Sequence, residues 1–105
     1  MEFVIAGIFD NDPEKIGTKI KKLQIQDIKM LPAFVNKTGT DIGIITVPPA
    51  VAQQVTDLLI ISGIKGILNL TATHIVSPGK VPVVDLKILN SLLELSCKIL
   101  SNDKK

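Results

Sequence analysis

Apolar residues in this chain gather in short, β-rich runs that alternate with stretches of helical spacing. Continuous apolar runs bounded by turn residues are typical of strands buried on both faces. The strands predicted in this way are Phe3–Phe9, Lys22–Gln26, Asp41–Pro48, Lys65–Leu70 and Val81–Val84. Strands separated by helices indicate βαβ units, a parallel sheet and right-handed crossovers. We therefore predict an α/β fold with a parallel sheet that helices cover on both faces.

The helical stretches have recognisable ends. Asp12 is expected to cap a first helical turn, with Pro13 in the first position, where a missing N–H costs nothing, and Gly17 at its end. Longer helices are predicted at Pro32–Thr38, Ala50–Ser62 and Asp85–Leu100. The last helix carries a wide apolar set consisting of Ile88, Leu89, Leu92, Leu93, Leu95, Ile99 and Leu100. We expect such a helix to be covered from two sides, and Cys97 within it to be buried.

Length and composition indicate one domain, residues 1–105, with a frayed tail at 101–105. The hydrophobic fraction is 46% and only three residues are aromatic, so the core is expected to consist of Ile, Leu and Val. The mean hydropathy of +0.39 leaves apolar surface to spare, which favours self-association. A net charge of +2 is too small for the concentrated basic surface of a nucleic-acid binder.

The compartment is indicated by what the sequence does not contain. A single cysteine, Cys97, excludes an internal disulfide and fits a reducing environment. No apolar run approaches the roughly 20 residues that a membrane-spanning helix needs, and no basic segment precedes the first apolar run as in a signal peptide. We therefore expect a cytoplasmic protein without a membrane partner.

Polar residues at the predicted strand ends are the candidate binding residues, because ligands of parallel sheets lie at the carboxyl ends of the strands. Asp10 closes the first strand, where an acidic residue can accept hydrogen bonds from both ribose hydroxyls of a dinucleotide and disfavour a 2′-phosphate. The alternative is an aspartate that only forms the turn. Val47 and Pro48 either wall a ring or form a rigid strand-to-helix turn.

The third strand end offers Asn69 and Thr71, which either dock a carboxamide or cap their own loop. His74 is the only histidine and has no metal-ligand or triad partners at suitable spacing, so we interpret it as a solvent-facing loop residue. No pair of carboxylates is placed for acid–base work. The sequence therefore predicts a binding protein with no metal site and no catalytic residues, not an enzyme.

Four segments together resemble a known family. In order and spacing, "FDNDPEKIG", "DIGIITVP", "SGIKGILNLTAT" and "VPVVDLKILNSLLEL" resemble the C-terminal NAD(H)-binding, Rossmann-like domain of the redox-sensing transcriptional repressor Rex. The resemblance covers about Phe3 to Leu100, nearly the whole chain. It implies a homodimeric repressor whose winged-helix domain binds operator DNA and whose Rossmann-like domain binds NADH or NAD⁺ and reports their ratio.

The resemblance also implies roles for individual residues. Asp10 would hold the adenosine ribose, with Asn11 and Lys15 at the adenine end. Val47 and Pro48 would wall the cofactor, and the loop Asn69, Leu70, Thr71 and Ala72 would lie near the nicotinamide. Asp85 would couple the two subunits, and the last helix would be exchanged between protomers.

Three departures from the family limit what this chain can do. Ala72 replaces a usual proline, which softens the loop near the nicotinamide. The winged helix is absent, so the chain is not expected to bind DNA by itself. The first βα unit with its G-x-G-x-x-G turn is also absent, which removes the amides that cradle the pyrophosphate and makes cofactor affinity doubtful.

The missing strand would lie between the strands Phe3–Phe9 and Asp41–Val47. Its absence predicts either that these two strands pair directly or that a partner fills a gap between them. Two other functions stay open: a CoA-binding domain related to acyl-CoA synthetases, and a pure dimerisation module. Titration with NADH, NAD⁺ and CoA separates the three hypotheses.

Overall fold

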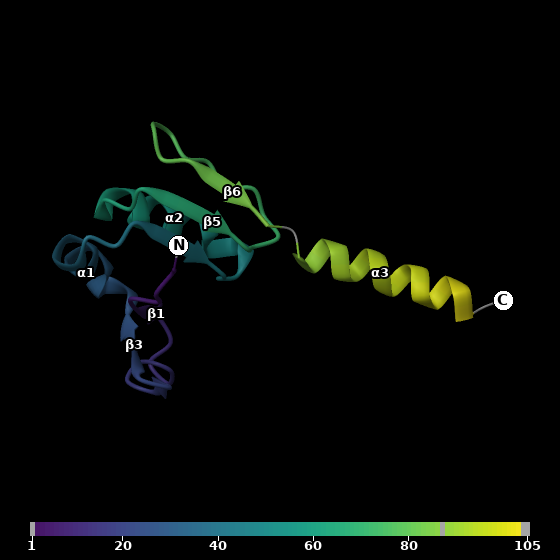
Figure 1. Cartoon of the computed structure of the whole chain (residues 1–105), viewed down its shortest axis with the longest axis horizontal. Helices are drawn as coiled ribbons and strands as arrows, with labels where there is room; N and C mark the ends of the chain where they lie inside the picture. The colour runs from purple at the N-terminus through teal and green to yellow at the C-terminus, as the bar shows by residue number, and fades with distance from the viewer. Residues whose placement is uncertain (1, 87, 104–105) are drawn as a thin grey trace.

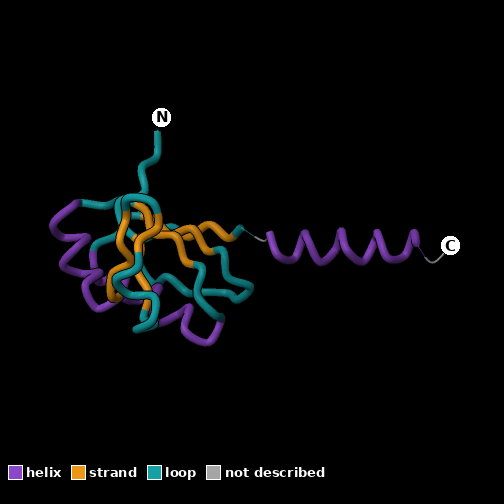
Figure 2. The backbone as a smooth tube through the Cα atoms, turned by 90° about the horizontal axis from the view of Figure 1, so that it is seen from below, coloured by secondary structure: helices purple, strands orange, loops and turns teal. Residues whose placement is uncertain are grey.

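Strands and two helices form a body from which a third helix extends (Figure 1, Figure 2). The computed structural model describes residues 2–86 and 88–103. The order of elements is β1 (Ile8–Asp10), β2 (Lys19–Ile20), β3 (Leu23–Asp27), η1 (Ile28–Met30), α1 (Leu31–Thr38), β4 (Ile42–Ile45), α2 (Pro49–Ser62), β5 (Gly66–Asn69), β6 (Val83–Asp85) and α3 (Ile88–Asp103). None of the helices in these residues combines the length and hydropathy needed to cross a bilayer.

The strands form two three-stranded sheets, in the orders β1-β3-β2 and β4-β5-β6. All strands of the second sheet are parallel, as is the β1–β3 pair, while the short β2 is antiparallel to β3. The predicted α/β class with parallel pairing is confirmed. β1 and β4 are both edge strands, and no pairing joins them in the part of the chain that the structure describes. Of the two arrangements expected for these strands, the structure therefore shows the unpaired one.

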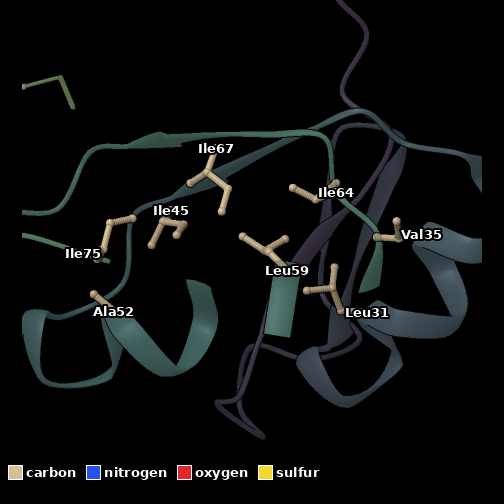
Figure 3. Packing of buried hydrophobic residues seen from close by; sticks show 8 residues of the cluster. All are labelled: Leu31, Val35, Ile45, Ala52, Leu59, Ile64, Ile67 and Ile75. Atoms are coloured by element: carbon tan, nitrogen blue, oxygen red, sulfur yellow. The ribbon is translucent and has the colours of Figure 1, made fainter. Parts of the chain in front are cut away.

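The main core lies where α2 covers one face of the β4–β5 pair. Leu59 of α2 lies among Ile45, Ile67 and the α1 residues Leu31 and Val35 (Figure 3). Gly43 of β4 is buried, and a Cβ atom built on it would lie 2.9 Å from the Leu59 Cδ1 atom. The absence of a side chain at this position therefore lets α2 approach the sheet closely.

The ends of α1 and α2 agree with the sequence patterns. Pro49 stands in the first turn of α2, and Gly63 ends the helix with a φ of +97°, a conformation that glycine adopts at little cost. Pro32 occupies the first turn of α1, and Gly39 ends that helix. The predictions Pro32–Thr38 and Ala50–Ser62 are confirmed to within one residue at each end.

The first predicted strand was too long. Only Ile8–Asp10 is a strand, and Phe3, Val4 and Ile5 are 77%, 85% and 70% exposed. The prediction of burial on both faces was wrong, because the residues of β1 are only half-buried and those before it are exposed. β1 pairs with β3 alone and is an edge strand. The predicted turn after Asp12 is confirmed as a single turn: Asp12 Oδ1 accepts from Glu14 N, and Gly17 ends the turn with a φ of +92°.

The last helix also differs from its prediction. Asp85 ends β6 and does not open the helix, which begins at Ile88 and continues past Leu100 to Asp103. The described side chains 91–102 are all exposed, so Cys97 is exposed as well, because one copy of the chain places nothing over α3 (Figure 1). Residues 104–105 of the expected frayed tail lie outside the described residues.

Candidate functional site

Asp10 stands at the carboxyl end of β1, and a tight turn holds its carboxylate. Asp10 Oδ1 accepts hydrogen bonds from Asn11 N at 2.7 Å and Asp12 N at 3.1 Å. Within the described residues, Asp10 Oδ2 makes no hydrogen bond or ion pair. The turn therefore orients the carboxylate, which confirms the reading of Asp10 as a turn residue. Its contact with a ribose stays a prediction.

The following turn places the other residues of this group. Asp12 Oδ1 accepts from Glu14 N at 3.0 Å, and the amides of Lys15 and Ile16 both donate to Asp12 O at 3.0 Å. These bonds fold the segment into one compact turn with exposed Asn11 and Lys15 side chains. Asn11 and Lys15 therefore lie in the turn that follows Asp10, the last residue of β1.

Asp27 is a neighbour of Asp10 that the sequence patterns missed. β1 and β3 are parallel, with Asp10 aligned to Asp27, so both strands end in a carboxylate at the same sheet edge. Asp27 Oδ1 accepts from Lys29 N at 3.0 Å and caps the short helix η1. The available signal was the same as for Asp10, an acidic residue closing a strand, but the predicted strand Lys22–Gln26 stopped one residue early.

A second group of candidate residues follows the ends of β4 and β5. Ile45, Asn69 and Asp85 are aligned across the sheet, and Leu70 N donates to Ile45 O at 2.9 Å. The structure thus brings the segment after β4, with half-buried Val47 and exposed Pro48, beside the segment 69–72. No strand pairing connects this group to Asp10, since the two groups belong to different sheets.

Asn69 fixes the start of the loop after β5. The residue is 1% exposed, and its Oδ1 atom accepts hydrogen bonds from Thr71 N at 3.0 Å and Thr71 Oγ1 at 2.6 Å. Its Nδ2 atom donates to Thr73 O at 2.9 Å. The surface of this loop is therefore formed by half-buried Thr71 and exposed Ala72, with the Asn69 side chain beneath them.

Gln53 of α2 holds the middle of the same loop and was also missed. Gln53 Nε2 donates to Val76 O and Gln53 Oε1 accepts from Val76 N, both at 2.8 Å. The two hydrogen bonds between Gln53 and Val76 and the burial of Ile75 attach the loop to the body, while His74, which precedes Ile75, is exposed. The residues lie 23 positions apart, so no local sequence pattern indicates the contact.

The chemistry of these groups is that of recognition by hydrogen bonds. Asp10 and Asp27 end neighbouring strands of the first sheet, and half-buried Val47 and Thr71 follow neighbouring strands of the second. In residues 2–86 and 88–103, no group of at least three His, Cys, Asp or Glu residues could hold a metal ion.

Comparison with known proteins identifies the family. The sequence profile described as "CoA binding domain" matches residues 1–73. The chain belongs to the CoA-binding domain family. The chain is 42% identical over 97 residues to the redox-sensing transcriptional repressor Rex of Caldicellulosiruptor bescii, and the match covers 92% of this chain and 45% of the relative. The chain therefore spans about half the length of the Rex relatives it matches.

Solved structures of Rex-family proteins share this fold. The crystal structure of RSP in complex with β-NADH covers 92% of the chain and 47% of RSP, at a TM-score of 0.79 and 30% identity. RSP in complex with β-NAD⁺ and operator DNA covers 93% of the chain and 45% of RSP, at a TM-score of 0.80 and 30% identity. The resemblance to the Rex CoA-binding-like, Rossmann-like domain is thereby confirmed.

Proposed function

We propose that this chain is the nicotinamide-dinucleotide-binding part of a Rex-like, cytoplasmic redox sensor, with no catalytic step of its own. The observation that carries the proposal is the match along 92% of the chain to a Rex repressor, together with the likeness to RSP bound to NADH. Binding of NADH or NAD⁺ would report the ratio of the two. The whole chain, residues 1–105, then acts as a single, partial NAD(H)-binding domain.

The adenosine half of the cofactor fits the turn after β1. Asp10 Oδ1 is held by two backbone amides, so Oδ2 is oriented to accept from a ribose hydroxyl. The charges of Asp10 and the aligned Asp27 both disfavour a 2′-phosphate, which favours NADH over NADPH. Asn11 and Lys15 would lie at the adenine end.

The nicotinamide half fits the ends of β4 and β5. Val47 and Pro48 would form the apolar wall, and Leu70, Thr71 and Ala72 would contact the nicotinamide. Asn69 contributes to this part from beneath, because its side chain is buried and hydrogen-bonded to the loop. No G-x-G-x-x-G turn, which supplies amides to a pyrophosphate, occurs in the 105 residues, so we expect these residues alone to bind the cofactor weakly.

A second copy of the chain is the proposed partner of α3. The exposed apolar side chains of this helix are Leu92, Leu93, Leu95, Ile99 and Leu100, each 52% to 59% exposed. The face of the second sheet opposite α2 is also open, with Ile44 60% and Val84 63% exposed. Exchange of α3 between two copies would cover both surfaces, and Asp85, just before α3, would couple the subunits. Operator DNA would be bound only by a longer family member that includes a DNA-binding domain.

CoA is the second candidate ligand, because the matching family profile describes a CoA-binding domain. CoA and NADH both contain adenosine, but CoA carries a phosphate on its ribose. The carboxylates of Asp10 and Asp27 at the ends of neighbouring strands would repel that phosphate. We therefore expect the chain to prefer NADH.

Isothermal titration with NADH, NAD⁺, NADPH and CoA tests the proposal. We expect NADH to bind more tightly than NADPH and CoA. Binding of CoA without any binding of NADH would overturn the proposal in favour of the CoA-binding alternative. Absence of binding by all four compounds would leave α3-mediated association as the function of this chain.

Asp10→Ala should weaken NADH binding at least about 5-fold, since it removes a charged hydrogen-bond acceptor worth about 1 kcal/mol or more. Glu14→Ala is the matched control, because it removes the same charge from an exposed position in the same turn. NADH titrations of both variants, with thermal unfolding to confirm their fold, provide the measurement. Equal affinities for the two variants would reduce Asp10 to a turn residue.

A further inference from the structure

The side chain of Asn69 uses its full hydrogen-bonding capacity inside the protein. In addition to its contacts with Thr71 and Thr73, Asn69 Nδ2 donates to Asp85 Oδ1 at 2.9 Å. A carboxamide has two N–H donors and one carbonyl oxygen with two lone pairs. All four positions of this 1% exposed residue are therefore occupied by partners in the same chain.

These partners belong to two different parts of the molecule. Thr71 and Thr73 form the loop after β5, whereas Asp85 ends β6 immediately before the segment that leads to α3. The main chain of Asn69 reaches the same segment, since Leu86 N donates to Asn69 O at 2.9 Å. Within the described residues no hydrogen bond joins Thr71 directly to Asp85, so Asn69 is their shared partner.

Because Asn69 bonds both the Thr71–Thr73 loop and Asp85, a displacement of the loop breaks hydrogen bonds of Asn69 unless the segment at Asp85 moves as well. A displaced Thr71 leaves Asn69 Oδ1, which is buried, without its donors, and an unpaired buried polar group costs more than an ordinary hydrogen bond contributes. Rotation of the Asn69 carboxamide to recover a partner would also move Nδ2 away from Asp85. Networks of this kind respond as a unit.

We infer that Asn69 is a positioning residue that couples the Thr71–Thr73 loop to Asp85 and the beginning of α3. The inference rests on the proposed function for its ligand, a nicotinamide dinucleotide. It goes beyond that function because it names Asn69 as the residue through which a ligand bound to the loop would shift the segment that follows β6. Asn69 acts through its neighbours and does not itself need to touch the ligand.

Amide hydrogen exchange at Leu86, followed by NMR, tests the coupling without any ligand. Thr71→Val removes one hydroxyl from the network and keeps the side-chain shape. It should raise the Leu86 exchange rate about 2- to 10-fold, as expected for neighbouring groups that share a partner. The Gly66 amide, which donates to Asp41 O at the opposite end of the sheet, serves as the internal reference for global unfolding. Thr18→Val, the same change in an exposed turn, should leave Leu86 unaffected.

Changes to the partners then show whether Asn69 carries the effect. In an Asn69→Leu background, Thr71→Val should no longer alter the Leu86 exchange rate. Asn69→Leu removes a buried network and can prevent folding, so the Asp85 variants provide a second route. Asp85→Ala should abolish the response to Thr71→Val, and Asp85→Asn, which keeps an acceptor oxygen for Asn69 Nδ2, should preserve it. An unchanged Leu86 rate in Thr71→Val, or the same response in Asp85→Ala as in the native chain, overturns the inference.

A ligand experiment separates this inference from the proposed function. Saturating NADH should shift the Leu86 amide resonance in the native chain and in Asp85→Asn, and should bind Asp85→Ala without that shift. If NADH does not bind the native chain, the proposed cofactor fails, while the ligand-free exchange measurements still decide the coupling. If NADH binds and moves Leu86 equally in Asp85→Ala, the coupling through Asn69 is wrong and the proposed function stands.

Discussion

The body of this protein and its α3 helix are similarly rich in leucine, isoleucine and valine, yet the body buries many of these side chains and α3 exposes those that the structure describes. In the body, α2 buries Ile45 and Ile67 of the sheet, which are 1% and 4% exposed. On α3, every described side chain from 91 to 102 is exposed. Apolar content alone therefore does not determine burial; a second surface of matching shape has to be present.

The difference has its origin in connectivity. The β4–α2–β5 connection brings α2 onto the β4–β5 pair, because β4 and β5 are parallel neighbours joined by that helix. No strand follows α3 in the described residues, so none of these residues returns the helix to the sheet (Figure 2). A body with a buried core and a helix whose described side chains are exposed should respond differently to substitution.

The largest effect is expected in the core of the body. Ile45→Ala removes a nearly fully buried side chain between α2 and the sheet and should lower the free energy of unfolding by about 2–5 kcal/mol. Urea unfolding monitored by circular dichroism measures the loss. Ile61→Ala on the outer face of α2, where the side chain is 80% exposed, should change it by less than about 0.5 kcal/mol. A similar cost at both positions would contradict the assigned core.

A smaller effect is expected where α2 approaches β4. Gly43→Ala places a Cβ atom 2.9 Å from two methyl carbons of Leu59, and should cost about 1–3 kcal/mol through overpacking. Gly66→Ala is the control, because its Cβ atom would meet nothing closer than Pro82 at 4.0 Å. Urea unfolding of both variants compares them. If a shorter residue at position 59 does not relieve the Gly43→Ala defect, the close approach is not its cause.

The smallest effect on the body is expected from α3. Leu92→Asp combined with Leu95→Asp should change the body's free energy of unfolding by less than about 0.5 kcal/mol, since both side chains are more than half exposed. The same pair should abolish self-association in a sedimentation velocity experiment. Ser96→Asp with Ser101→Asp adds the same charge at exposed positions that are already polar, and should leave association intact. Sedimentation of the unmodified chain as a monomer would remove the basis for a partner on α3.

Much of the fold was accessible from the sequence because its signals are local. Proline and glycine mark the ends of α1 and α2, and the alternation of strands and helices indicated the α/β class. The turn at Asp10 was also visible as an acidic residue closing an apolar run. The contacts of Asn69 with Thr71 agree with the loop capping that the sequence offered as one reading. The bond from Asn69 to Asp85 and the contact between Gln53 and Val76 were not accessible, because they join residues that only folding brings together.

The sequence by itself determined the ends of α1 and α2 and the alternation of strands and helices, since caps, turns and apolar periodicity act within a few residues of the chain. It did not determine where β1 and α3 begin. The tertiary structure alone decided which apolar runs are buried: Phe3 to Ile5 and α3 remain exposed, and α2 does not. It also decided that β1 and β4 stay unpaired in separate sheets. The physical reason is that burial and strand pairing each require a second surface, and a local pattern carries no information about whether that surface exists.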